Sequence, residues 1–148
     1  MKDSAGQDPK NQGQRNYFYR LDQMKVEAFA PEMTTSAGAL VEGNKMYFGL
    51  VHKARGSGSQ MHHHPFEQFN YVLKGTLKAW VDGNEELVTV GGLIHIPANT
   101  MHSIVATSEE DVIFLMVKEV TPMGVAGIPK NPNVTSPRYE AGFGPKAM

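Results

Sequence analysis

Three consecutive histidines stand at positions 62 to 64, and a Glu-Gln pair follows them at positions 67 and 68. Residues two apart in an extended strand point to the same face, so the imidazoles of His62 and His64 can reach one ion. Gln68 lies an even number of residues further on, whereas Glu67 has the opposite parity. Parity therefore predicts that His62, His64 and Gln68 bind a metal and that His63 points away from it.

Glu67 stays open as an alternative to Gln68, because Pro65 lies between the histidines and the Glu-Gln pair. A bend or bulge at this proline shifts the phase of the strand by one residue and exchanges the two side chains. Glu67 then serves as the fourth ligand or accepts a hydrogen bond from an imidazole N–H. Asn70 shares the parity of Gln68, so we expect it to project inward as a polar contact beside the metal.

The same stretch resembles the first motif of the cupin superfamily, which reads Gly, five residues, His-x-His, three or four residues, Glu, six residues, Gly. The matching positions are Gly56, His62, His64, Gln68 and Gly75, with Gln where the family usually has Glu.

A second stretch resembles the second cupin motif, and the two motifs together cover residues 56–106. Its matching positions are Gly91, Pro97, Asn99 and His102. Asn99 stands where the family usually has Gly, and Ala106 stands at the final Asn position. Asn is common among non-glycine residues with positive φ, so we expect a left-handed turn at Asn99.

The resemblance implies that His102 joins His62, His64 and Gln68 around one metal inside a barrel. Three neutral imidazoles and an amide oxygen suit a first-row divalent ion, for which we favour Fe or Mn over Ni, Zn or Cu. The neutral fourth ligand leaves the charge of the ion uncompensated, which favours an anionic or chelating substrate in the open positions.

Short runs rich in Val, Ile, Phe and Tyr recur from "YFYRL" (17–21) to "DVIFLMVKEV" (111–120), bounded by Gly, Pro, Asn or Asp. They predict an all-β protein, and the resemblance makes it a cupin-type jelly-roll barrel. We expect a single barrel domain over residues 15–120. A flexible leader (1–14) precedes it, and an irregular Pro/Gly-rich tail (121–148) lies over the barrel or a neighbouring subunit.

Length and composition limit the other possibilities. A chain of 148 residues suits one domain, and a net charge of -1 gives no support for nucleic-acid or membrane-surface binding. The sequence contains no cysteine, so a metal must use His, carboxylate or amide ligands. We expect a cytoplasmic protein, and a homodimer, because the run at 17–21 and the tail offer strands for exchange.

The predicted function is that of a metal-dependent enzyme acting on a small oxygenated substrate, by a dioxygenase-type or an isomerase/lyase-type reaction. The alternative is a non-catalytic cupin that binds or senses a small ligand. Candidates for a catalytic role are His52, Glu67 and Asn70. His52 follows Met46, Phe48 and Leu50 on one strand face, and His95 alternates with Ile94 and Ile96, so each histidine lines the cavity or caps a sheet edge.

Overall fold

The computed structural model describes residues 17–122, 124–125 and 136–144. Within them the chain forms two antiparallel sheets and one 3-10 helix, η1 (Leu21–Gln23). No helix in these ranges is long and apolar enough to cross a bilayer. The strands are β1 (Glu27–Ala28), β2 (Ala37–Glu42), β3 (Met46–Lys53), β4 (Ser57–Gly58), β5 (Gln68–Lys74), β6 (Leu77–Val81), β7 (Asn84–Val88), β8 (Leu93–Ile96), β9 (His102–Ala106), β10 (Val112–Glu119) and β11 (Arg138–Tyr139).

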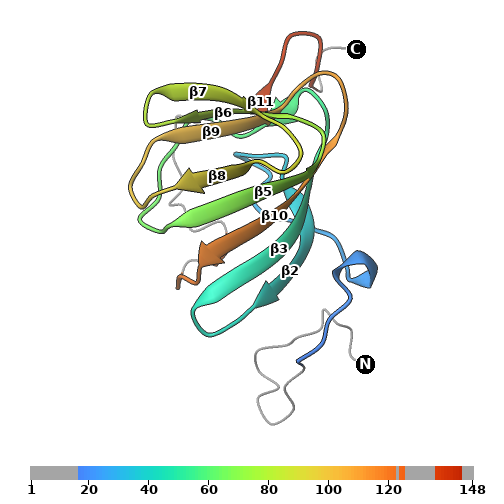
Figure 1. The fold of residues 1–148 in the computed structure, drawn as a ribbon, viewed down its shortest axis with the longest axis vertical. Coiled ribbons are helices and arrows are strands. Elements are labelled where there is room, and N and C mark those ends of the chain that lie inside the picture. The colour runs from blue at the N-terminus through green and yellow to red at the C-terminus, as the bar shows by residue number, and fades with distance from the viewer. Residues whose placement is uncertain (1–16, 123, 126–135, 145–148) are drawn as a thin grey trace.

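The two sheets form the two layers of a jelly roll (Figure 1). One has six strands in the order β1-β2-β3-β10-β5-β8, and the other has five in the order β11-β4-β9-β6-β7. Side chains from both sheets make one hydrophobic core, as expected for two sheets packed face to face. Its largest fully buried apolar members are Leu77, Ile96, Val51, Val72 and Val112. The prediction of a single all-β barrel domain is confirmed.

The ends of the chain differ from the expected pattern. The run at 17–21 does not form a strand: Leu21 begins η1, and Tyr17 and Phe18 are 77% and 92% exposed. A strand requires a partner, and the sheet ends at β1, which has only two residues. The leader at 1–14 lies outside the described residues. Within the tail, β11 pairs with β4 on the edge of the smaller sheet.

β3 and β10 are the central pair of the larger sheet, and their inward faces line the interior. Burial alternates along both strands, so that Tyr47 and Val51 of β3 and Phe114 of β10 point into the core. The same alternation places Lys53 and Lys118 inside, 3% and 5% exposed. Each lysine ends the inward row of its strand, and the two rows run antiparallel. The two lysines therefore enter the interior from opposite ends of the strand pair.

Two turns within the cupin-like motifs each contain a residue in the left-handed region of backbone conformation. Gly75 joins β5 to β6 with φ 83°, and a Cβ there would lie 2.7 Å from the Asp111 carbonyl oxygen. Only glycine fits both conditions. Asn99 has φ 61°, which confirms the positive φ expected where the motif usually has Gly. Its backbone N–H donates to the His64 carbonyl at 2.7 Å, so this turn ties the second motif to the first.

Candidate metal centre

The centre begins with a backbone bridge between the two motifs. His62 and His102 form an isolated antiparallel bridge, in which each N–H donates to the other's carbonyl at 2.9 and 2.8 Å. Residues that face each other in such a pair carry their side chains on the same side. The two imidazole centroids therefore lie 4.2 Å apart. His64 completes the group, with its ring centroid 4.8 Å from that of His102.

Each of the three imidazoles is oriented by a backbone carbonyl. Nδ1 of His62 lies 2.6 Å from the Gln60 oxygen, Nδ1 of His64 lies 3.0 Å from the Phe66 oxygen, and Nδ1 of His102 lies 2.8 Å from the Thr100 oxygen. A carbonyl oxygen only accepts, so the proton of each neutral ring sits on Nδ1. Nε2 is left with its lone pair in all three rings, which is how histidine ligands are held in metal sites.

The electrostatics keep the rings neutral. Burial lowers the pKa of His62, and lowers that of His64 to about 4 and that of His102 to about 3. Lys118 and the neighbouring histidines lower these pKa values further. At neutral pH the rings are uncharged and their ligand atoms lie within 4.8 Å of one another. The three residues fit a transition-metal ion by donor type, protonation and proximity.

The cluster opens onto a cavity with a volume of about 70 Å³. Gln68 and Asn70, which begin β5, both line it, and Nε2 of Gln68 donates to Oδ1 of Asn70 at 3.0 Å. Asn70 is 1% exposed. The remaining lining side chains are mainly apolar or hydroxylic, together with two lysines; they are Phe29, Ala30, Thr34, Ser36, Lys53, Ser59, Ile104, Phe114, Met116, Lys118 and Val125.

The premise of a regular strand through the histidines is wrong. β5 starts only at Gln68, while His62 lies in the isolated bridge and His64 lies outside any strand. A bend at Pro65 and Phe66 separates the two parts. His62 and His64 share a site because of the bridge to His102 and the turn at Asn99, both of which are tertiary contacts.

Two of the three catalytic candidates lie outside the cavity lining. Glu67 is about half exposed, and its Oε2 lies 2.6 Å from Nε2 of His95, whose ring stacks on Phe69. His52 is exposed on β3, because the face that it shares with Met46, Phe48 and Leu50 is the outer face of the sheet. Asn70 is the candidate that reaches the site.

Lys53 and Lys118 are the cavity residues that the sequence reasoning missed. Lys53 Nζ donates to Thr34 Oγ1 at 3.1 Å and to Ser36 Oγ, and Lys118 Nζ donates to the Val125 carbonyl at 2.7 Å. Burial lowers the pKa of Lys53 to about 7 and that of Lys118 to about 8. The sequence does contain a signal for their inward position: Lys53 lies on the same strand face as Val51, and Lys118 on the same face as Phe114. This signal is ambiguous because both faces of these strands carry apolar residues.

Comparisons with known proteins agree with this geometry. The family model described as the cupin domain matches residues 49–118, which include the three clustered histidines. Residues 49–118 form a cupin domain, which confirms the resemblance seen in the two motifs. Members of the cupin superfamily often bind a metal, and the three clustered histidines of this chain have the donor type and proximity to hold one. A search of curated proteins gave no match.

Solved structures of cupins share the fold. The polyketide cyclase RemF from Streptomyces resistomycificus has a TM-score of 0.62 at 20% identity, over 70% of this chain and 79% of that one. An RmlC-like cupin from Shewanella frigidimarina has a TM-score of 0.61 at 17% identity, over 72% and 93%. KdgF from Halomonas sp. has a TM-score of 0.53 at 21% identity, over 67% and 83%. At these low identities, the likeness shows that the folds are similar and does not extend to function.

The buried lysine predicts an unusual pH dependence of stability. The pKa of Lys53 is about 7 in the folded protein and 10.5 in the unfolded chain, so the unfolded state binds the extra proton between these values. Burial of the Lys53 side chain therefore destabilises the folded protein fully below pH 7, and this destabilisation is relieved as the pH rises towards 10.5. We expect Lys53→Met to raise the unfolding free energy of metal-free protein by roughly 1–4 kcal/mol at neutral pH.

Urea unfolding of the wild type and Lys53→Met across this pH range measures the effect, with the exposed lysine variant Lys25→Met as the control. The gain should shrink as the pH approaches 10. A gain that is absent at neutral pH, or that grows with pH, contradicts the assignment of a buried ammonium.

Proposed function

We propose that this cupin is a metal-dependent enzyme that acts on a small, oxygen-rich anionic substrate. One observation carries the proposal: the cavity combines three neutral histidines with the ammonium groups of Lys53 and Lys118, and no Asp or Glu is among its described lining residues. A bound divalent ion would add further positive charge. Such a site attracts anions, because charges in a low-dielectric cavity are poorly screened.

The metal set that we propose is His62, His64, His102 and Gln68. The Gln68 amide supports its inclusion, because its nitrogen donates to Asn70 and its Oε1 is left to face an ion. This donor set suits a first-row divalent metal, and Fe or Mn is our first expectation. When bound, such an ion supplies a Lewis acid that polarises a substrate oxygen.

We propose that Lys118 takes up and returns a proton during the reaction. It is buried beside the histidines, as its effect on their pKa values shows, and its own pKa of about 8 lies close to neutral pH. A group with such a pKa can both take and return a proton. This favours an isomerase- or lyase-type reaction, in which a C–H next to a carbonyl is broken, over a dioxygenase-type reaction.

The metal set predicts that His64→Ala or His102→Ala abolishes stoichiometric metal binding, because each removes one of three converging imidazoles. Metal analysis of protein purified without chelator measures the occupancy. Gln68→Ala should lower the affinity for metal more than Glu67→Ala, since Glu67 faces His95 instead. Full occupancy in either histidine variant, or larger loss in Glu67→Ala, refutes the set.

The reaction class predicts C–H exchange without oxygen consumption. Metal-loaded protein is incubated in D₂O with a panel of small uronates, diketones and catechols, and deuterium incorporation and oxygen uptake are followed together. We expect deuterium to enter a uronate or a diketone, and Lys118→Met to slow this by about 10²-fold or more while metal occupancy is kept. Lys25→Met serves as the exposed control.

Three results count against this reaction. Oxygen uptake on a catechol or diketone assigns a dioxygenase-type activity instead. Binding of panel members without any turnover assigns the non-catalytic binding role. Exchange at the wild-type rate in Lys118→Met removes the lysine from the chemistry.

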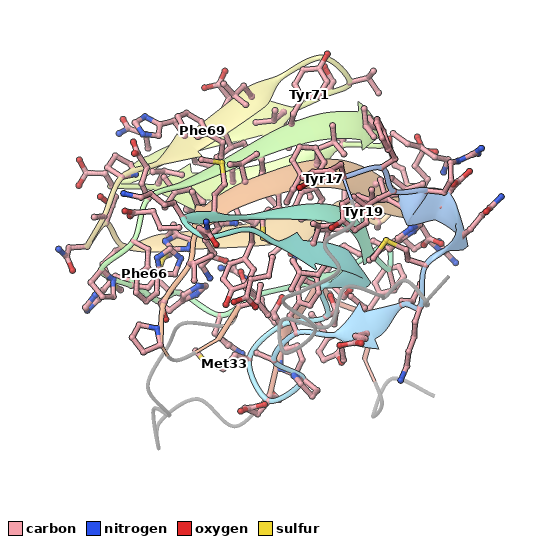
Figure 2. All side chains as sticks on the ribbon, turned by 90° about the horizontal axis from the view of Figure 1, so that it is seen from below. Tyr17, Tyr19, Met33, Phe66, Phe69 and Tyr71 are labelled. Carbon is pink, nitrogen blue, oxygen red and sulfur yellow. The ribbon has the colours of Figure 1, made fainter. Side chains whose placement is uncertain are left out.

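We also propose that the protein is a homodimer. The outer face of the larger sheet carries continuous apolar rows across paired strands, one of them formed by Leu93, Tyr71, Leu115 and Leu50. Exposure in this face is high for large apolar side chains, with Leu93 at 57% and Tyr71 at 40%. Figure 2 shows Tyr71 beside Phe69 at the surface of β5. A self-complementary apolar face suits a two-fold axis.

Sedimentation at micromolar concentration should show a dimer. Tyr71→Glu is expected to shift it to a monomer, because it places a charge at the centre of the row. Leu87→Glu is the matched control, since Leu87 is 60% exposed on β7 of the other sheet. A monomeric wild type, or dissociation by the control alone, contradicts this interface.

A further inference from the structure

Lys53 is a buried cation that the proposed metal set does not use. It lines the cavity at 3% exposure, and the partners of its Nζ are the hydroxyls of Thr34 and Ser36. Among the ion pairs of the described residues, none joins Lys53 to a carboxylate. Hydroxyl groups solvate a buried ammonium without neutralising it, so this charge is energetically costly unless an anion joins it.

The donors around Lys53 match one carboxylate. An ammonium has three N–H donors, and the two hydroxyls accept two of them. The Thr34 hydroxyl donates to Ser36 Oγ at 3.3 Å, while no bond among the described residues uses the hydrogen of Ser36 itself. Both Ser36 and Lys53 line the cavity. One N–H and one O–H are therefore left for the two oxygens of a carboxylate.

The position of Lys53 separates it from the metal ligands. It pairs with Val112 in the strand register, whereas Lys118 lies six residues further along β10, roughly 20 Å of extended backbone. Lys118 lowers the pKa of all three clustered histidines, but Lys53 lowers only that of His62. Gln68 of the proposed metal set pairs directly with Lys118 in the strand register, so the metal set lies at the Lys118 end of β10 and Lys53 lies at the other end.

We propose that Lys53 and Ser36 form a second anion subsite, which binds one carboxylate of a small dicarboxylic acid whose hydroxyl- or oxo-carboxylate end binds at the histidine cluster. This inference rests on the proposed function and names its substrate class. The apolar walls between the two ends include Phe114, whose ring centroid lies 5.9 Å from the Lys53 Nζ. Such walls suit the short carbon chain of a diacid.

The size of the cavity limits the acid. Its volume is about 70 Å³, compared with roughly 10–15 Å³ for one water on the same measure. That space holds a molecule of several non-hydrogen atoms, not a nucleotide or an oligosaccharide. We therefore limit the diacid to a short chain of four or five carbons.

The test uses three acids that share a 2-hydroxycarboxylate end. Lactate lacks a second carboxylate, whereas malate and 2-hydroxyglutarate carry one on a chain of increasing length. Titration calorimetry on metal-loaded protein, slightly below neutral pH so that Lys53 is charged, measures each affinity. We expect at least one diacid to bind about 30-fold or more tightly than lactate. Lys53→Met should abolish this preference, because it weakens diacid binding far more than lactate binding, and metal content should be retained.

Ser36→Ala is the second variant, because it keeps the buried cation and removes the hydroxyl that would donate to the carboxylate and that accepts from Lys53. It should lower diacid affinity by about tenfold. Lys25→Met is the control lysine and should behave like the wild type. Thermal unfolding of each variant checks that the fold is retained.

The outcomes separate the subsite from the proposed function. A wild type that binds metal but shows no preference for either diacid over lactate refutes the subsite alone. A preference that survives in Lys53→Met refutes it as well, and leaves Lys53 with a structural role. Failure of the wild type to bind metal refutes the proposed metal centre, and the subsite that rests on it falls with it.

Discussion

The backbone bridge between His62 and His102 is the contact on which the rest of the site depends. It consists of two hydrogen bonds between segments forty residues apart in the chain. The pairing of β4 with β9 and the bond from the Ser59 N–H to the Ile104 carbonyl set the register of the preceding residues, and the bridge extends this register to His62, which gives the imidazoles a common direction. The Asn99 turn adds a third bond, to the carbonyl of His64. These three backbone hydrogen bonds hold the three imidazoles together, so their positions do not depend on flexible side-chain contacts.

Around this bridge the protein accumulates positive charge in a buried place. Carbonyl groups fix the protons of the imidazoles on Nδ1, and burial keeps the rings neutral. The two lysines then enter the same cavity from opposite ends of β3 and β10. Burying such charges costs free energy, and hydrophobic burial elsewhere in the barrel offsets this cost. A buried cation such as Lys53, whose described partners are hydroxyl groups, is typical of sites where a ligand completes the electrostatics.

The two faces of the larger sheet have different physical roles, although both are rich in apolar residues. The inner face of β3 and β10 ends in the lysines, while the outer face carries Phe48, Leu50 and Leu115 and continues onto β5 and β8. Glu67 and His95 belong to that outer face and bind each other there. Side-chain parity decides this division, since a shift of one residue would exchange the two sets.

The all-β class, the two motifs and the left-handed turn at Asn99 follow from the sequence, because turn chemistry and residue spacing are local properties. The sequence also indicated that Gln68 and Asn70 share a face, since both lie in one regular strand. Tertiary structure alone decided that His62 and His64 meet through the bridge to His102, that the run at 17–21 lacks a partner strand, and that His52 points outward while Lys53 points inward. In β3 both faces are apolar, so its alternation carries no information about which side the second sheet covers; only the packing of the two sheets supplies it.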